Sequence, residues 1–357
     1  MIHKIEAKIL DQNAHAVKYL KVQGLKDSAG IIKSINFQIN RDFGLTGPLT
    51  LSTPSKRVHA IRWAIARESF VVETNVKRVT KETVAACIAQ INKCPYCEDV
   101  HGTSISSAGD KNIAKAIENG TWQLLKDERT KEIVNWSLNT LNPQSEIIRN
   151  PPFTAKEAPE IIGTALVFHS TNRLVSIFLE NSPFPLFLSN PLIKKTTLNL
   201  ASKTLFKSMI SKKADSGDAL KFIEDYPFSK QFKWAEFVPA YSKALAAREI
   251  LLKKIEHEVI PVKAVEVFKN KINRWQGEEM PLGKSWLTGT LNNLSETEKP
   301  VAQLMFLAAF APYTIIRKDV ENFRKIKHGD KELIEVCFWA IQILTDRIRE
   351  WLIKPFE

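Results

Sequence analysis

The sequence predicts an all-α protein. Many stretches place apolar residues at positions i, i+3, i+4 and i+7, the period of an amphipathic helix, whereas short alternating Val, Ile and Thr runs typical of strands are few. Only 13 of the 357 residues are glycine, and 44% are hydrophobic. This composition is typical of an ordered globular chain, long enough to bury a large core and to form two domains.

The N-terminal residues contain no unbroken apolar segment of the kind that forms a signal peptide. The most apolar stretch, residues 304–316, is too short to cross a bilayer and contains Pro312. Four cysteines in a chain of this length do not suggest a disulfide framework. We therefore expect a cytoplasmic protein that does not bind membranes.

The chain is basic, with a formal net charge of +12 at pH 7. Part of the excess lies in six lysines: Lys194, Lys195, Lys203, Lys207, Lys212 and Lys213. Attraction to an acidic partner or to nucleic acid is one interpretation. The lysines are spread out without clustered arginines or aromatic residues, which favours the solvated face of a connecting helix. We expect no nucleic-acid partner.

A predicted helix leads into the motif Cys94-Pro-Tyr-Cys97. Thr80 can cap this helix, and its apolar residues follow a 3.6-residue period: Val84, Ala85, Ile88 and Ile91. The pattern ends at residues 92–93. Cys94 then stands at the start of a second helix, with Pro95 in the first turn, where proline is favoured.

This position favours a reactive dithiol. A free thiol has a pKa of about 8.5, but at a helix N-terminus or within a Cys-x-x-Cys motif the pKa can fall to roughly 3.5–7.5. Cys97 and His101 are one helical turn apart and share a face, so they can exchange a proton. Cys94 and Cys97 are near enough to close a disulfide.

Glu82 can complete a proton relay with His101. If the chain reverses near residues 92–94, the two helices run antiparallel, and a Glu side chain, with or without one water, can span the gap to His101. The order Glu82, His101, Cys97 then resembles an acid–base–nucleophile relay. The alternative is that Glu82 only complements the dipole of its helix.

Three other uses of the cysteine pair are less favoured. Glutaredoxins share the tetrapeptide Cys-Pro-Tyr-Cys, but there it follows a strand. A structural zinc site would need Cys87 to join the two motif cysteines and His101, and Cys87 lies in an Ala-rich stretch typical of a buried core residue. Haem attachment needs a His where Glu98 stands. We therefore expect no metal and no cofactor.

Glu82 followed by Cys94-x-x-Cys97-x-x-x-His101 resembles the motif of the alkylhydroperoxidase D-like branch of the carboxymuconolactone decarboxylase superfamily. The run INKCPYCEDVH is very similar to that motif, and residues 160–180 resemble the helix that follows it. The resemblance covers residues 40–190. It implies an all-α fold and a peroxiredoxin-type alkylhydroperoxidase, an oxidoreductase that reduces a small hydroperoxide.

The resemblance also implies roles for the motif residues. Cys97 would be the attacking thiolate that becomes a sulfenic acid, Cys94 the proton donor and resolving thiol, and Glu82 with His101 the proton relay. A dithiol or lipoyl-type protein would supply the electrons. Tyr96 stands where some members of the family have a His. The alternatives are a non-peroxidase disulfide oxidoreductase or a redox-sensing binding protein and, less favoured, a lactone decarboxylase.

The second half of the sequence contains a weaker copy of this region. Residues 297–318 align without gaps on residues 80–101, with Pro312-Tyr313 in register with Pro95-Tyr96. The four reactive positions are occupied there by Lys299, Ala311, Thr314 and Lys318. The pattern predicts a duplicated unit whose second copy keeps the helical frame without the active-site residues and packs on the first copy. Chance similarity of two amphipathic helices is the alternative.

We thus expect three regions, namely a catalytic unit at 1–190, a basic connecting segment at 191–230 and a degenerate second unit at 231–357. A homo-oligomer is compatible with this organisation, because a duplication replaces only one interface. Of the remaining candidates, Cys337 and His59 are expected to be structural core residues. His169, which precedes Asn172-Arg173, is a candidate for lining the site.

Overall fold

The computed structural model describes residues 15–108, 110–181, 212–224 and 230–357. These residues form helices joined by loops, and no strand occurs among them, so the all-α prediction is confirmed. The lysines from Lys194 to Lys207 and most of the predicted connecting segment 191–230 lie outside the described residues. So do residues 1–14, where a signal peptide would begin.

The helices of the first half lead up to one long apolar helix. In chain order they are α2 (Gly30–Asp42), α3 (Gly47–Thr50), α4 (Lys56–Ala66), the π-helical turn η1 (Arg67–Val71), α5 (Arg78–Ile91), α6 (Pro95–Ser107), α7 (Lys111–Glu118), η2 (Trp122–Leu124), α8 (Glu128–Leu138), α9 (Glu146–Arg149) and α10 (Ala158–Phe178).

The second half ends in the longest helix. Its elements are η5 (Leu220–Phe222), η6 (Lys230–Ala235), α13 (Pro239–Val259), α14 (Val262–Arg274), η7 (Ser285–Leu287), α15 (Thr288–Leu291), α16 (Lys299–Phe310), η8 (Pro312–Thr314), α17 (Arg317–Arg324), α18 (Asp330–Ile353) and η9 (Lys354–Phe356). The elements labelled η in this half are short 3-10 turns.

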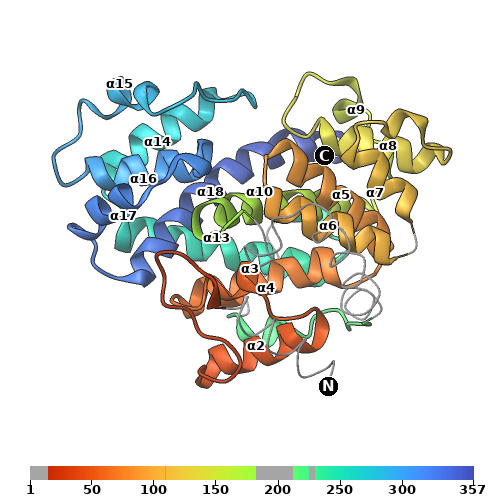
Figure 1. The fold of residues 1–357 in the computed structure, drawn as a ribbon, viewed down its shortest axis with the longest axis horizontal. Coiled ribbons are helices and arrows are strands. Elements are labelled where there is room, and N and C mark those ends of the chain that lie inside the picture. The colour runs from red at the N-terminus through yellow and green to blue at the C-terminus, as the bar shows by residue number, and fades with distance from the viewer. Residues whose placement is uncertain (1–14, 109, 182–211, 225–229) are drawn as a thin grey trace, which may run out of the picture.

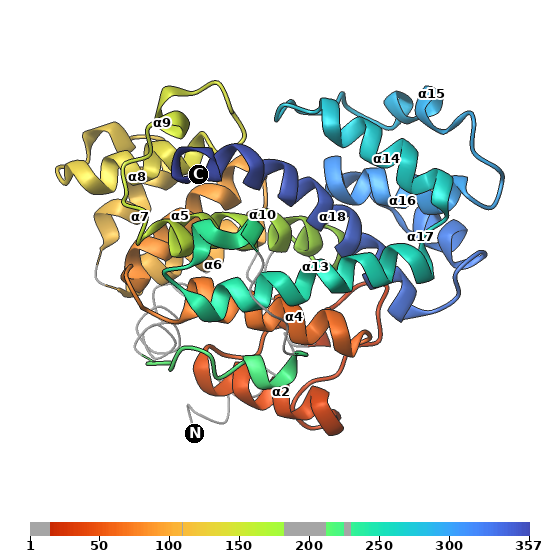
Figure 2. The same ribbon diagram turned by 180° about the vertical axis from the view of Figure 1, so that it is seen from behind.

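The helices α10 and α18 pack on each other in the middle of the molecule (Figure 1). At one end α5 packs on α10, with α6–α9 around it, and at the other end α16 packs on α18, with α14, α15 and α17 around it (Figures 1 and 2). α13 and α4 pack on each other along one side of this pair. Each end of the molecule is therefore built on one of the two central helices.

One hydrophobic core extends from α2 to α18 through both halves. Among its largest fully buried side chains are Trp63, Trp136 and Trp339. α10 is long and apolar enough to cross a membrane by length and composition, unlike the stretch 304–316, which was predicted to be too short. Because 89% of its apolar window is buried inside the protein, α10 is placed as a core helix.

The predicted second copy departs from the helical frame of the first. The turn η8 begins at Pro312 but ends after three residues, at Thr314, whereas α6 continues for 13 residues from Pro95. The expectation that the frame persists through residue 318 is therefore wrong beyond Thr314. The duplication itself, and the division at residues 190 and 230, stay predictions.

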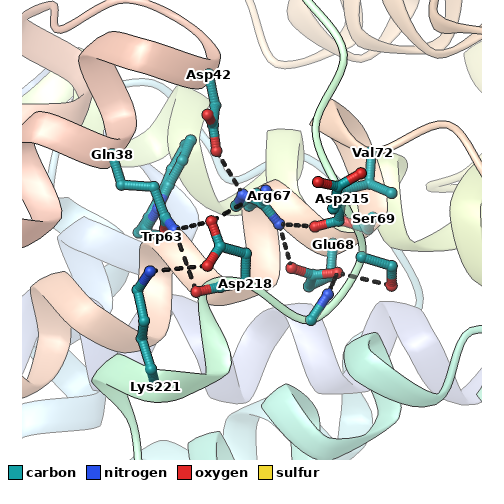
Figure 3. Close-up of polar contacts among 12 residues, drawn as sticks. Gln38, Asp42, Trp63, Arg67, Glu68, Ser69, Val72, Asp215, Asp218 and Lys221 are labelled. Atoms are coloured by element: carbon teal, nitrogen blue, oxygen red, sulfur yellow. Dashed lines mark hydrogen bonds and ion pairs between the residues drawn. The ribbon is translucent and has the colours of Figure 1, made fainter.

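A buried polar cluster attaches the described part of the connecting segment to the first half (Figure 3). Arg67, in η1, has a side chain that is fully buried. It donates to Asp42 at 2.7 Å, to Glu68 at 2.8 Å and to the backbone oxygen of Asp215 at 2.7 Å. Glu68 also accepts from the backbone N–H of Gly217 at 2.9 Å. Each charge has an opposite partner, as a buried structural cluster requires.

Candidate functional site

The two motif cysteines lie at the turn between α5 and α6. α5 ends with Asn92 as its C-cap residue, and Lys93 has a left-handed φ of 52° that reverses the chain. Cys94 is the N-cap residue of α6 and Pro95 occupies the first helical position. The reversal at residues 92–94 and the start of the second helix are as predicted, and α5 begins two residues earlier than Thr80, at Arg78.

The predicted contact between Glu82 and His101 is present. Glu82 Oε2 lies 2.7 Å from His101 Nδ1, and both side chains are buried, with 1% and 5% exposed. No intervening water is needed at this distance. The interpretation that Glu82 only complements a helix dipole is therefore wrong, since its carboxylate joins the two helices.

Arg78 is a partner of Glu82 that the sequence analysis did not identify. Its Nε and Nη2 atoms lie 2.9 and 2.8 Å from Glu82 Oε1, so the two carboxylate oxygens are divided between Arg78 and His101. Burial alone would raise the pKa of Glu82, but Arg78 and the hydrogen bond with His101 outweigh it and hold that pKa below its usual value. Glu82 is ionised at neutral pH.

Aromatic rings enclose this charged pair. The ring of Phe168, from α10, meets the His101 ring edge to face with centroids 4.4 Å apart. The Phe70 ring lies against Phe168 at 4.8 Å and under the Arg78 guanidinium at 4.1 Å. These apolar walls lower the local dielectric, which strengthens the interaction of Glu82 with its two partners.

Both motif thiols are free and almost completely buried, with Cys94 1% and Cys97 3% exposed. Burial, together with the hydrogen bond to the Cys94 thiol and the nearby Glu98, raises the pKa of Cys97 well above its usual value. The expectation of a lowered thiol pKa is therefore wrong for this resting state. Desolvation outweighs the favourable position at the helix N-terminus.

The other two cysteines are core residues, as predicted. Cys87 packs in a separate small cluster that includes Ile105 and Ile113, and Cys337 lies in the main core. Burial raises the pKa of both thiols. Within the described ranges, no group of three or more His, Cys, Asp or Glu side chains is arranged to hold a metal ion.

His169 supports the turn rather than the Glu82–His101 pair. Its ring is hydrogen-bonded to Thr140 at 3.0 Å and to Asn92 at 3.2 Å, and burial, with the nearby Arg173, lowers its pKa well below the usual value. Arg173 binds Asn92 Oδ1 at 3.0 Å and the backbone oxygen of Ala309 at 2.8 Å. The residue two positions before Cys94 is thus tied to α10, and through Arg173 to the end of α16.

In the part of the chain that the structure describes, helical packing without strands, a dithiol at a helix start and a buried Glu–His pair on the same hairpin agree with the resemblance of the motif to the alkylhydroperoxidase D-like family. The chain is 26% identical over 337 residues to the protein named alkyl hydroperoxide reductase Rv2159c from Mycobacterium tuberculosis. The match covers 94% of this chain and 95% of that protein, and it supports the assignment to the alkylhydroperoxidase D-like family. The chain matches no protein-family model and no solved structure.

This similarity extends beyond the resemblance seen in the motif. The motif and its neighbouring helix account for residues 40–190, whereas the match covers nearly the whole chain. The second half of the protein is therefore part of what the two proteins have in common.

Proposed function

We propose that this protein is a thiol-dependent hydroperoxide reductase that uses Cys97 and Cys94 as its redox pair. The observation that carries the proposal is the buried Glu82–His101 hydrogen bond of 2.7 Å, one helical turn from Cys97. The name of the mycobacterial relative, alkyl hydroperoxide reductase, supports the same reaction class. The relay and the dithiol mechanism rest on the geometry of this chain.

In the proposed first step Cys97 attacks the distal oxygen of a hydroperoxide. A sulfur–oxygen bond forms, the oxygen–oxygen bond breaks, and the leaving alkoxide takes a proton and departs as the alcohol. Cys97 becomes a sulfenic acid. In the second step the Cys94 sulfur displaces the hydroxyl group as water, so that a Cys94–Cys97 disulfide forms. Two electrons have then passed from the dithiol to the peroxide.

His101 is the proposed base for the first step. A carboxylate only accepts hydrogen bonds, so the bond to Glu82 places the proton of a neutral His101 on Nδ1 and leaves Nε2 as an acceptor. Cys97 is four residues before His101 in α6 and shares its face. Since the resting pKa of Cys97 is raised, His101 has to take the thiol proton as the peroxide is attacked.

The cycle closes when a reductant restores the dithiol. A dithiol or lipoyl-type protein is the proposed donor, because exchange with a second dithiol returns Cys94 and Cys97 to thiols and leaves the donor as a disulfide. We further propose a cytoplasmic location, where such donor proteins are kept reduced. If the protein is a homo-oligomer, we propose that its interfaces leave the turn at Cys94 accessible to the donor protein.

Turnover of alkyl hydroperoxide in the presence of a small dithiol tests the proposal. We expect the Cys97→Ser variant to fall to the background rate and the Cys94→Ser variant to stop at a sulfenic acid, detected by mass spectrometry. Cys87→Ser is the matched control, since that thiol lies in the separate cluster with Ile105 and Ile113. Equal peroxide consumption by wild type and Cys97→Ser would contradict the proposal.

One observation favours a second candidate function. Burial of both thiols and the raised pKa of Cys97 slow spontaneous oxidation, as suits a disulfide oxidoreductase or a redox-sensing protein that reacts only with a docked partner. Such a protein would form the Cys94–Cys97 disulfide from a protein disulfide faster than from peroxide. Measurement of both oxidation rates on the same preparation separates the two functions.

A further inference from the structure

A second site lies apart from the dithiol, in a cavity of about 60 Å³ where α4, α10, α13 and α18 meet. Its apolar wall includes Trp63, Leu166 and Phe338. None of the four motif residues lines it. The cavity therefore serves neither of the steps proposed above.

Three arginines line this cavity, one from each of α4, α13 and α18: Arg62, Arg248 and Arg349. Arg248 lies 2.6 Å from Asp346, and Arg349 lies 3.5 Å from the same carboxylate oxygen. Two of the three guanidinium groups thus share one acidic partner.

Arg62 has only neutral partners within the described part of the chain. It donates to Ser52 Oγ at 2.9 Å and to the backbone oxygen of Pro48 at 3.0 Å. Burial lowers the pKa of Arg62 to about 10, which leaves it charged at neutral pH. The neighbouring His59 adds no charge, because burial and Arg62 lower its pKa to about 3. It is a structural histidine, hydrogen-bonded to Ser52 and Asn36 as expected of a core residue.

Several donors of these arginines have no acceptor among the described residues. Arg248 is only 4% exposed, yet its Nε atom is buried without a hydrogen-bond partner, and so are Nε and Nη1 of Arg349. Buried donors of charged groups are costly to leave unpaired. Both the surplus of positive charge and the unpaired donors point to an acceptor that is negatively charged.

We propose that this cavity binds a compact oxyanion, either inorganic phosphate or the carboxylate of a small organic acid. A cavity needs roughly 10–15 Å³ for each water-sized group, so about 60 Å³ admits a group of about four to six non-hydrogen atoms. Guanidinium forks match the oxygen spacing of phosphate and carboxylate. A dianion would balance the excess of two charges left by three arginines and Asp346.

Such a ligand would join the two halves of the chain. Arg62 belongs to the first half, and Arg248 and Arg349 belong to the second. A ligand that binds only the folded protein raises its thermal stability in proportion to the logarithm of its concentration. We therefore expect phosphate or oxalate to raise the melting temperature of the full-length protein beyond what chloride does at equal ionic strength.

Isothermal titration calorimetry of the full chain with phosphate, and separately with oxalate, tests the proposal. We expect one saturable site, with affinity reduced about tenfold or more in Arg62→Gln and in Arg349→Gln, because each loses charge-assisted hydrogen bonds. Arg149→Gln removes the same charge from an exposed position and is the matched control. Circular dichroism verifies that each variant is folded.

The two titrations identify the source of the oxyanion. Binding of phosphate alone assigns an inorganic or phosphorylated ligand, binding of oxalate alone assigns an organic acid, and binding of both assigns a general oxyanion site. Absence of saturable binding by either probe overturns the proposal. Equal affinity in wild type and both cavity variants overturns it as well, since the ligand would then bind elsewhere.

Discussion

The turn at Cys94 and the turn at Ala311 begin alike and end differently. In the first, the backbone N–H of Cys97 donates to the Cys94 oxygen at 3.0 Å, and in the second, that of Thr314 donates to the Ala311 oxygen at 3.0 Å. Each turn follows an apolar helix and contains Pro-Tyr. Only the first continues into a helix of 13 residues.

The residues after the second turn explain why it stops. Ile315 and Ile316 are β-branched and adopt extended backbone conformations. Asp319 accepts a hydrogen bond from the Ile316 N–H at 2.8 Å, which starts the separate helix α17. The tyrosines differ accordingly, with Tyr96 6% exposed and Tyr313 55% exposed.

This difference shows that the Pro-Tyr turn alone does not form a site. His101 meets Glu82 because α6 continues for another turn past Cys97 and stays packed on α5. In the second region Lys318 is exposed, and Lys299 pairs with Glu296 near the surface. Uninterrupted helix beyond the motif is thus a condition for the relay.

The largest difference between the two regions is expected in the rate of Cys97 oxidation when the proposed base, His101, is removed. His101→Gln should slow the oxidation of Cys97 by peroxide by about 10²–10⁴-fold, the usual contribution of a general base. Lys318→Gln, at the aligned position, should leave the rate unchanged. Stopped-flow measurement of tryptophan fluorescence or of thiol loss supplies the rate. Equal rates for wild type and His101→Gln would show that another group takes the proton.

The second-largest effect is expected on the free energy of unfolding, when Glu82 is replaced. Glu82→Gln leaves the buried Arg78 charge without its carboxylate, and we expect a loss of about 3 kcal/mol in the free energy of unfolding. Lys299→Gln should change that free energy by less than about 0.5 kcal/mol, since it is a surface substitution. Urea unfolding followed by circular dichroism measures both. If the two variants lose equal stability, Arg78 and Glu82 are not an energetically coupled pair.

The sequence was sufficient to predict the parts of the site that depend on local spacing. The 3.6-residue period and Pro95 indicated where α5 ends and α6 begins. The spacing of Glu82 and His101 from the turn indicated their contact. Both follow from helix geometry alone, which requires no knowledge of the remaining chain.

Long-range packing decided what the sequence could not predict. Arg78 was missed because the apolar pattern placed the helix start at Thr80, although a basic residue four positions before Glu82 was an available signal. Phe168 reaches His101 from α10, a distant segment. The raised pKa of Cys97 is likewise a result of burial, which depends on how α5, α6 and α10 pack together.

Acidification is expected to have a smaller effect, on the difference in unfolding free energy between wild type and Glu82→Gln. The pKa of Glu82 is lower in the folded protein than its usual value, so its contribution to stability is complete above the unfolded pKa of about 4.3 and is lost as the pH falls through the folded value. The difference in unfolding free energy between wild type and Glu82→Gln should therefore shrink on acidification below that pH. Urea titrations at neutral and acidic pH measure it. A difference that is constant with pH would mean that Glu82 is not the titrating group.

The smallest effect concerns Tyr96, which stands where some alkylhydroperoxidase D-like proteins have a His. A His at this buried position would be desolvated and neutral, and hence a second base beside Cys97. We expect Tyr96→His to raise the rate of peroxide oxidation by about tenfold or less, below the usual range for a general base, because His101 already takes the proton. Tyr313→His in the second region should have no effect.

The double variant Tyr96→His, His101→Gln sharpens this test. If the new histidine acts as a base, it should restore part of the rate lost in His101→Gln, and the two substitutions should not be additive, because both groups serve the same thiol. If the double variant is as slow as His101→Gln, the relay depends on the carboxylate of Glu82 as well as on a base near the sulfur. The difference between the two regions would then lie in the buried Glu–His pair rather than in the number of bases.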